Sequence, residues 1–141
     1  MNPGVLFVSP REQDASRLSQ MLASLPIAFE HVNNLQQARV RLQNEPYGVI
    51  LTEADLPDGM WLELLDFARE LAEIPEVIVT DPMADARFWA EAINLGAYDL
   101  ISQPFYEPEV RRILSNACTR IARKEPGTEK SVRQKAAHAM I

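Results

Sequence analysis

The stretch from Val49 to Gly59, VILTEADLPDG, decides how the rest of the chain is interpreted. Its first four residues are apolar or β-branched, which is typical of a buried strand. The strand is followed by a carboxylate, Glu53, and then by a Pro-Asp-Gly turn at residues 57–59. An acid at the end of a buried strand raises the question of whether that carboxylate has a chemical role.

Short apolar runs and helical patterns alternate along the whole chain. The patterns predict strands at residues 5–8, 27–32, 48–52, 77–79 and 99–102, and helices at 11–25, 34–44, 61–72, 85–95 and 108–121. Asn34 is expected to cap the second helix and Gly96 to end the fourth. This alternation predicts an α/β fold, a doubly wound sandwich with a five-stranded parallel sheet covered on both faces.

The length and charge of the chain predict one domain with a short tail. Of the 141 residues, 1–123 are expected to form the domain and 124–141 a flexible basic tail that begins at a Pro-Gly break. Residues 1–123 hold ten Arg, no Lys and eighteen acids, whereas the tail carries a small positive excess. An acidic domain argues against nucleic acid as a partner of the core.

The composition also predicts a cytoplasmic protein that does not bind a membrane. No apolar run approaches the ~18 residues of a membrane span, and the N-terminus lacks a signal-peptide pattern. The single cysteine, Cys118, lies on an apolar helical stripe and is expected to be a small core residue. No cofactor fingerprint or metal-ligand spacing is found, so we expect no cofactor and no metal, and His31 and His138 are expected at the surface.

Ligands of an open parallel sheet bind outside the carboxyl ends of its strands. The residues at and just after those ends are therefore the candidate crevice residues. They are Ser9, Pro10, Glu53, Thr80, Asp81 and Gln103.

Three spaced segments resemble the response-regulator receiver domain, the phosphoacceptor module of bacterial two-component signalling. VILTEADLPDG resembles the acceptor strand and its turn, VIVT places Thr80 at the switch hydroxyl, and AINLGAYDLISQPF resembles the signature that ends in Pro-Phe. The resemblance covers residues 4–123. It implies a flavodoxin-like fold with strand order 2-1-3-4-5 and a cis peptide bond before Pro104.

The same resemblance implies a chemistry that this sequence lacks. The family moves a phosphoryl group from a histidine kinase onto an aspartate, and it needs Mg²⁺ on an acidic pair and a lysine to offset the added charge. Here the acceptor position is Glu53, the acidic pair is replaced by Ser9 and Pro10, and the lysine by Gln103. The aromatic switch position is Leu100.

These replacements leave the roles of the crevice residues open. Ser9 is expected to cap the first helix, with Pro10 at its first position. Thr80 either donates its hydroxyl to Glu53 or is only a strand residue. Glu53 is either a fixed negative charge that resembles the phosphorylated state or a solvated carboxylate without a role.

The favoured interpretation is a degenerate receiver, not an enzyme, that acts through protein–protein contact without phosphorylation at Glu53. One alternative is a regulator still phosphorylated at Glu53, Asp55 or Asp58. Another is a small metal binder or enzyme, whose cation site would combine Glu53, Asp55, Asp58 and Asp81.

The expected interface is the family's signalling surface, formed by the fourth helix, the fifth strand and the fifth helix. An unidentified signalling protein, or a second copy in a homodimer, is the expected partner. Trp is favoured at binding hot spots, although the aromatic residues there could equally pack in the core. The interface candidates are Phe88, Trp89, Leu100 and Tyr106.

Overall fold

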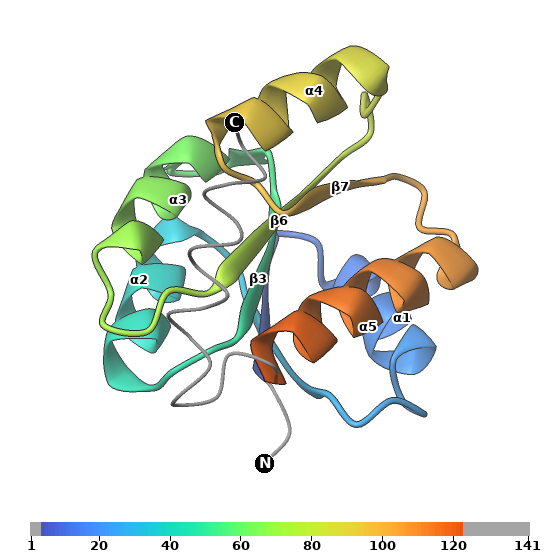
Figure 1. Cartoon of the computed structure of the whole chain (residues 1–141), viewed down its shortest axis with the longest axis horizontal. Helices are drawn as coiled ribbons and strands as arrows, with labels where there is room; N and C mark the ends of the chain where they lie inside the picture. Colours follow the sequence, from blue (N-terminus) through green and yellow to red (C-terminus); the bar gives the residue numbers. More distant parts are fainter. Residues whose placement is uncertain (1–3, 123–141) are drawn as a thin grey trace.

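Residues 4–122 are described by the computed structural model, and a five-stranded parallel sheet lies at their centre (Figure 1). The predicted tail, 124–141, and His138 within it lie outside the described residues. The strands are β1 (Gly4–Val8), β2 (Ala28–Val32), β3 (Val49–Glu53), β6 (Glu76–Asp81) and β7 (Asp99–Ser102). The helices are α1 (Glu12–Met21), α2 (Leu35–Asn44), α3 (Trp61–Arg69), α4 (Ala86–Leu95) and α5 (Glu107–Ala122).

The strand order is β2-β1-β3-β6-β7, and neighbouring strands are parallel throughout. This confirms the predicted flavodoxin-like α/β fold and its order 2-1-3-4-5. The peptide bond between Gln103 and Pro104 is cis, as the resemblance implied.

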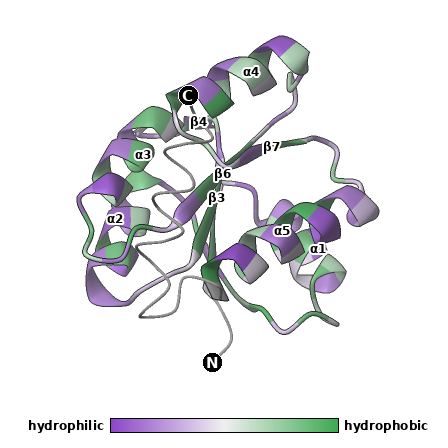
Figure 2. Ribbon diagram, in the orientation of Figure 1, coloured by the Kyte–Doolittle hydropathy of each residue, from purple (hydrophilic) through white to green (hydrophobic). Residues whose placement is uncertain are grey.

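Two apolar cores hold the layers together, one on each face of the sheet. Alternate residues of a strand point to opposite faces, so Leu6 packs toward α2 and α3 while Phe7 packs toward α1 and α5. The strands β1, β3 and β6 are therefore apolar and buried on both faces over most of their length, which explains the continuous apolar runs in the sequence (Figures 1 and 2). Within residues 4–122, no helix combines the length and the apolar character that a membrane span requires.

The segment after β3 differs from its prediction. β3 extends to Glu53, one residue beyond the predicted strand, because the Glu53 backbone pairs with Thr80 of β6. The chain then makes a small antiparallel hairpin of β4 (Asp55–Leu56) and β5 (Gly59–Met60), which leads into α3. The Pro-Asp-Gly turn was predicted, but the hairpin was not, because strands of two residues have no periodicity to detect.

The first helix is shorter than its apolar pattern suggested. α1 ends at Met21, and Leu22 follows it as the C-cap with φ −101° and ψ 0°. Leu22 is nevertheless buried against the α1–α5 core. Its side chain therefore continued the apolar spacing in the sequence although its backbone has left the helix.

The helix α4 rests on the domain through few buried side chains. Ala92 is its one buried residue, and the helix ends at Gly96, where φ is 119°, as predicted. Arg69 of α3 donates to the carbonyl of Leu95 at 2.7 Å and so satisfies one C-terminal oxygen. The outer side of α4 is left uncovered within residues 4–122, where Trp89 and Leu95 are about half exposed.

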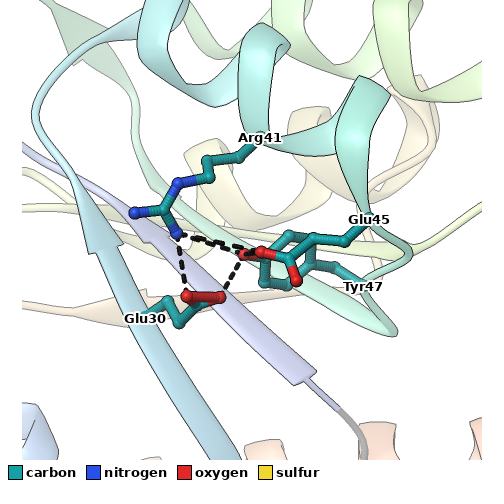
Figure 3. A network of polar contacts seen from close by, with 4 residues as sticks. All are labelled: Glu30, Arg41, Glu45 and Tyr47. Atoms are coloured by element: carbon teal, nitrogen blue, oxygen red, sulfur yellow. Dashed lines mark hydrogen bonds and ion pairs between the residues drawn. The ribbon is translucent and has the colours of Figure 1, made fainter.

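A polar network fastens the edge strand β2 to the end of α2 (Figure 3). Arg41 donates to Glu30 at 2.8 Å, and the Tyr47 hydroxyl lies within hydrogen-bonding distance of both Glu30 and Glu45. Chiefly because of the hydrogen bond from Tyr47, and despite partial burial, the pKa of Glu30 is held below its ordinary value. Because β2 is an edge strand that water reaches, these polar contacts stabilise it in place of apolar burial.

Candidate functional site

The carboxyl ends of the parallel strands bring the predicted crevice residues to one edge of the sheet. Glu53 is level with Thr80 in the strand register, and Thr80 with Ile101, so the ends of β3, β6 and β7 lie side by side. Ser9 follows β1, whose Val8 is level with Thr52. Sequence positions more than forty residues apart therefore meet at this edge.

Glu53 is buried, and its carboxyl group is held by Ser9. Its side chain is 5% exposed, and its Oε2 accepts a hydrogen bond of 2.8 Å from the hydroxyl of Ser9, which is fully buried. The alternative in which Glu53 is a solvated carboxylate is therefore wrong. Within residues 4–122, no ion pair reaches the Glu53 carboxyl.

Ser9 is not the helix cap that its sequence context suggested. α1 begins at Glu12 with Arg11 as the N-cap, and Arg11 makes no capping hydrogen bond with its side chain. The Ser9 oxygen accepts the backbone N–H of Arg11 at 3.0 Å while its proton goes to Glu53. The short polar side chain therefore bridges the start of α1 to β3, an arrangement that only the adjacency of β1 and β3 creates.

Thr80 does not donate to Glu53. Its hydroxyl is fully buried and donates to the carbonyl of Ile101 at 2.8 Å, which uses its one proton. The amide of Gln103 donates to the same Thr80 oxygen at 3.2 Å. Of the two alternatives for Thr80, donation to Glu53 is thus wrong, and the residue at the lysine position, Gln103, is a neutral amide that donates to Thr80.

Two of the three remaining acids of this edge accept backbone N–H groups, and the third is exposed. Asp81 accepts the N–H of Met83 at 2.9 Å, and Asp55 is exposed on β4. Asp58 accepts the N–H groups of Leu35 and Gln36 at 2.8 and 3.0 Å. Nowhere in the described range do three or more His, Cys, Asp or Glu side chains come together as a metal site.

Asp58 accepts hydrogen bonds from the N-terminus of α2, although the two lie more than twenty residues apart in the sequence. Although desolvation opposes ionisation, the two backbone hydrogen bonds hold the pKa of Asp58 below its ordinary value. Asn34 adds the predicted cap by accepting the N–H of Gln37 at 2.8 Å. The loop that follows Glu53 is therefore tied to α2, which the sequence did not reveal.

Replacing Asp58 by Ala should lower the free energy of unfolding by about 1 kcal/mol at neutral pH, the usual effect of losing a capping side chain. Because the folded pKa is depressed, this stabilisation is present above the ordinary value of 3.8 and is lost as the pH falls through the folded pKa. Urea unfolding of both proteins at pH 7 and pH 3 checks the difference. Asp55→Ala, at an exposed neighbouring acid, is the control, and an equal effect of the two variants would contradict the capping role.

The prediction for His31 is wrong, whereas the prediction for Cys118 is confirmed. His31 is half-buried rather than at the surface, and its Nε2 donates to the backbone oxygen of Ser9 at 2.7 Å beside the Phe7 ring. Since the Ser9 hydroxyl points to Glu53, His31 cannot activate it. Cys118 is buried as predicted, and its burial raises the pKa of the thiol to about 11.

The interface candidates divide into exposed and buried residues. Trp89 is 48% exposed and Tyr106 is 66% exposed, while Phe88 is half-buried against the core beneath α4. Leu100 is only 8% exposed and packs in that core, so its proposed place in a surface is wrong. Leu100 fills the space between the sheet and α4. The sequence pattern of this strand does not reveal whether such a position is buried or exposed.

Two hollows open at the same edge of the sheet. The larger, of about 630 Å³, lies between the start of α1, residues 33–34 and Pro57. The smaller, of about 270 Å³, lies between α1 and the loops after β6 and β7, and we call it the Arg11/Arg17 hollow. Its lining residues are Arg11, Asp14, Arg17, Pro82, Gln103, Pro104 and Phe105.

Two curated proteins of similar sequence are a response regulator and a DNA-binding transcriptional regulator. The response regulator protein PilR of Pseudomonas aeruginosa is 24% identical over 107 residues, which make up 75% of this chain and 24% of that protein. The DNA-binding transcriptional regulator NtrC of Proteus hauseri is 29% identical over 108 residues, or 76% of this chain and 22% of that protein. The chain thus spans about a quarter of the length of these relatives. No family model matches the chain.

Solved structures share the fold over most of the chain. The signal receiver domain of an HD domain-containing protein from Pseudomonas fluorescens has a TM-score of 0.77 at 25% identity and covers 86% of this chain and 98% of its own. The beryllofluoride-activated NtrC4 receiver domain, a dimer, has a TM-score of 0.76 at 24% identity and covers 84% and 98%. The chain therefore shares the fold of signal receiver domains, and its sequence is similar to part of a response regulator.

Proposed function

We propose that this receiver domain acts in cytoplasmic signal transduction through protein–protein contact, without phosphorylation at Glu53. The observation that carries the proposal is the buried contact between Glu53 and Ser9. A carboxyl group in that position needs positive charge beside it before it can accept a second anion. Here the group that contacts the Glu53 carboxyl is the neutral hydroxyl of Ser9.

The groups around Glu53 support the loss of phosphoryl transfer. Ser9 and Pro10 offer no carboxylate to Mg²⁺, which prefers carboxylate and phosphate oxygens. Gln103 carries no charge, and residues 1–123 contain no lysine that could take its place. Without a divalent ion and an ammonium group, the charge that develops during transfer is not offset.

Glu53 is also a poor imitation of a phosphorylated side chain. A phosphoryl group brings three acceptor oxygens and nearly two charges. The single Glu53 carboxyl group accepts from Ser9, whereas the Thr80 hydroxyl donates to Ile101. We therefore assign Glu53 a structural role, in which it joins β3 to the start of α1.

The surface of α4 and the start of α5 is the proposed contact site. Trp89 and Tyr106 expose large aromatic side chains there, and Trp89 is held in place because its indole N–H donates to Asp99 at 3.0 Å. A Trp side chain that is already ordered loses little entropy when it is buried by a partner. The dimer formed by the similar NtrC4 receiver domain supports a second copy of this chain as the partner.

Sedimentation of the purified chain is expected to detect a dimer whose dissociation constant is unaffected by beryllofluoride with Mg²⁺. Trp89→Ala should raise that constant about tenfold, because aromatic anchors dominate such interfaces. Val40→Ala, which truncates an equally exposed apolar residue on α2, is the control. A chain that stays monomeric at all concentrations would contradict the dimer, and tighter association with beryllofluoride would contradict independence from phosphorylation.

A further inference from the structure

The Arg11/Arg17 hollow contains two arginines that lack carboxylate partners. Within residues 4–122, Arg39, Arg41, Arg69 and Arg120 each lie within 4.0 Å of an acid, whereas neither Arg11 nor Arg17 does. Both are exposed, Arg11 as the N-cap residue of α1 and Arg17 within α1, and both line the same hollow. Three other described arginines, Arg87, Arg111 and Arg112, also have no acid within 4.0 Å, but they do not line this hollow.

Positions six apart on a helix are rotated by about 120° from each other, so it is the shared hollow, and not one face of α1, that brings the two arginines together. Six residues separate them, which corresponds to a rise of about 9 Å. Asp14 lies between them in the sequence and lines the hollow as well, so the three side chains carry a net charge of +1. Like charges that share a concave surface raise the local potential and attract anions.

The opposite wall of the hollow adds a polar donor and apolar surface. Gln103 uses one N–H of its amide for Thr80, and the second N–H on the same nitrogen can turn toward a ligand. Pro82, Pro104 and Phe105 supply the apolar part of the lining. The volume of the hollow is about 270 Å³.

We propose that the Arg11/Arg17 hollow binds a phosphate group. Arginine binds phosphate in a bidentate manner, and two guanidinium groups match a group with two negative charges better than one with a single charge. The source of this group is either free inorganic phosphate or a small phosphate monoester whose organic part contacts Phe105. This site does not involve the Glu53 carboxyl, so it goes beyond the proposed function and does not depend on it.

Calorimetric titration at constant ionic strength with inorganic phosphate, phenyl phosphate and sodium chloride tests the proposal. Both phosphates should bind, and amide NMR should report the shift at the Gln103 side chain. Phenyl phosphate binding at least tenfold more tightly than phosphate identifies a monoester as the source, while equal affinities identify the free ion.

Charge-removing variants decide whether the two arginines are responsible. Arg11→Gln and Arg17→Gln should each weaken phosphate binding about tenfold or more, the size expected for a charged hydrogen bond. Arg112→Gln, at an exposed arginine of α5, should leave it unchanged. Binding no tighter than that of chloride, or equal losses in all three variants with unchanged melting temperatures, would overturn the proposal.

Discussion

The intact mass of the protein is expected to remain unchanged after incubation with acetyl phosphate and Mg²⁺. The carboxyl of Glu53 is displaced from an aspartate position by one C–C bond of roughly 1.5 Å, and a misplacement of about 1 Å can cost ~100-fold in rate. The missing divalent ion removes several kcal/mol of stabilisation of the transition state. The two losses multiply, so the rate of phosphoryl transfer to Glu53 should be roughly 10⁴-fold or more below the rate for a receiver that has an aspartate and a bound divalent ion.

A variant with the family's residues restored provides the positive control for this experiment. It combines Ser9→Asp, Pro10→Asp, Glu53→Asp and Gln103→Lys, which return two metal ligands, the shorter acceptor and the ammonium group. Mass spectrometry of this variant should detect one added phosphoryl group under the same conditions. A stable phosphate on the unaltered chain, mapped to Glu53 or to Asp55 or Asp58, would refute the proposed function.

Ser9→Ala should lower the free energy of unfolding by about 1.5–3 kcal/mol, the range for hydrogen bonds to charged groups. The Ser9 hydroxyl is fully buried, donates to Glu53 and accepts the N–H of Arg11. Alanine removes both hydrogen bonds and leaves the Glu53 carboxyl without its donor in a site that is nearly closed to water. Chemical unfolding monitored by circular dichroism measures the change.

Two further variants separate this effect from that of a lost side chain. Ser16→Ala, at an exposed serine of α1, should change stability by less than ~0.5 kcal/mol. The double variant Ser9→Ala with Glu53→Leu should recover much of the loss, because replacing both members of a buried polar pair by apolar groups is often nearly neutral. If Ser9→Ala behaves like Ser16→Ala, or if the double variant is less stable than the single one, the structural role of the pair is wrong.

The fold was predictable because it depends on local patterns. The apolar runs around Val49–Thr52 and Val77–Val79 identify strands buried on both faces, and such strands with helices between them form a parallel sheet. Helix ends at Asn34 and Gly96 follow from the backbone preferences of those two residues. The edge of the sheet that bears the candidate site was also predictable, because the carboxyl ends of parallel strands lie at the same edge.

The sequence by itself thus determined the fold, the residues at the crevice and the absence of the charges that phosphoryl transfer needs. Only the tertiary structure decided what those residues do. The Ser9 hydroxyl donates to Glu53 instead of capping α1, the Thr80 hydroxyl donates to Ile101, and Asp58 caps α2. It likewise buried Leu100 and left Trp89 exposed. The physical reason is that a fold follows from the periodicity of apolar residues along the chain, whereas a polar side chain bonds to whichever donor or acceptor the folded chain places beside it.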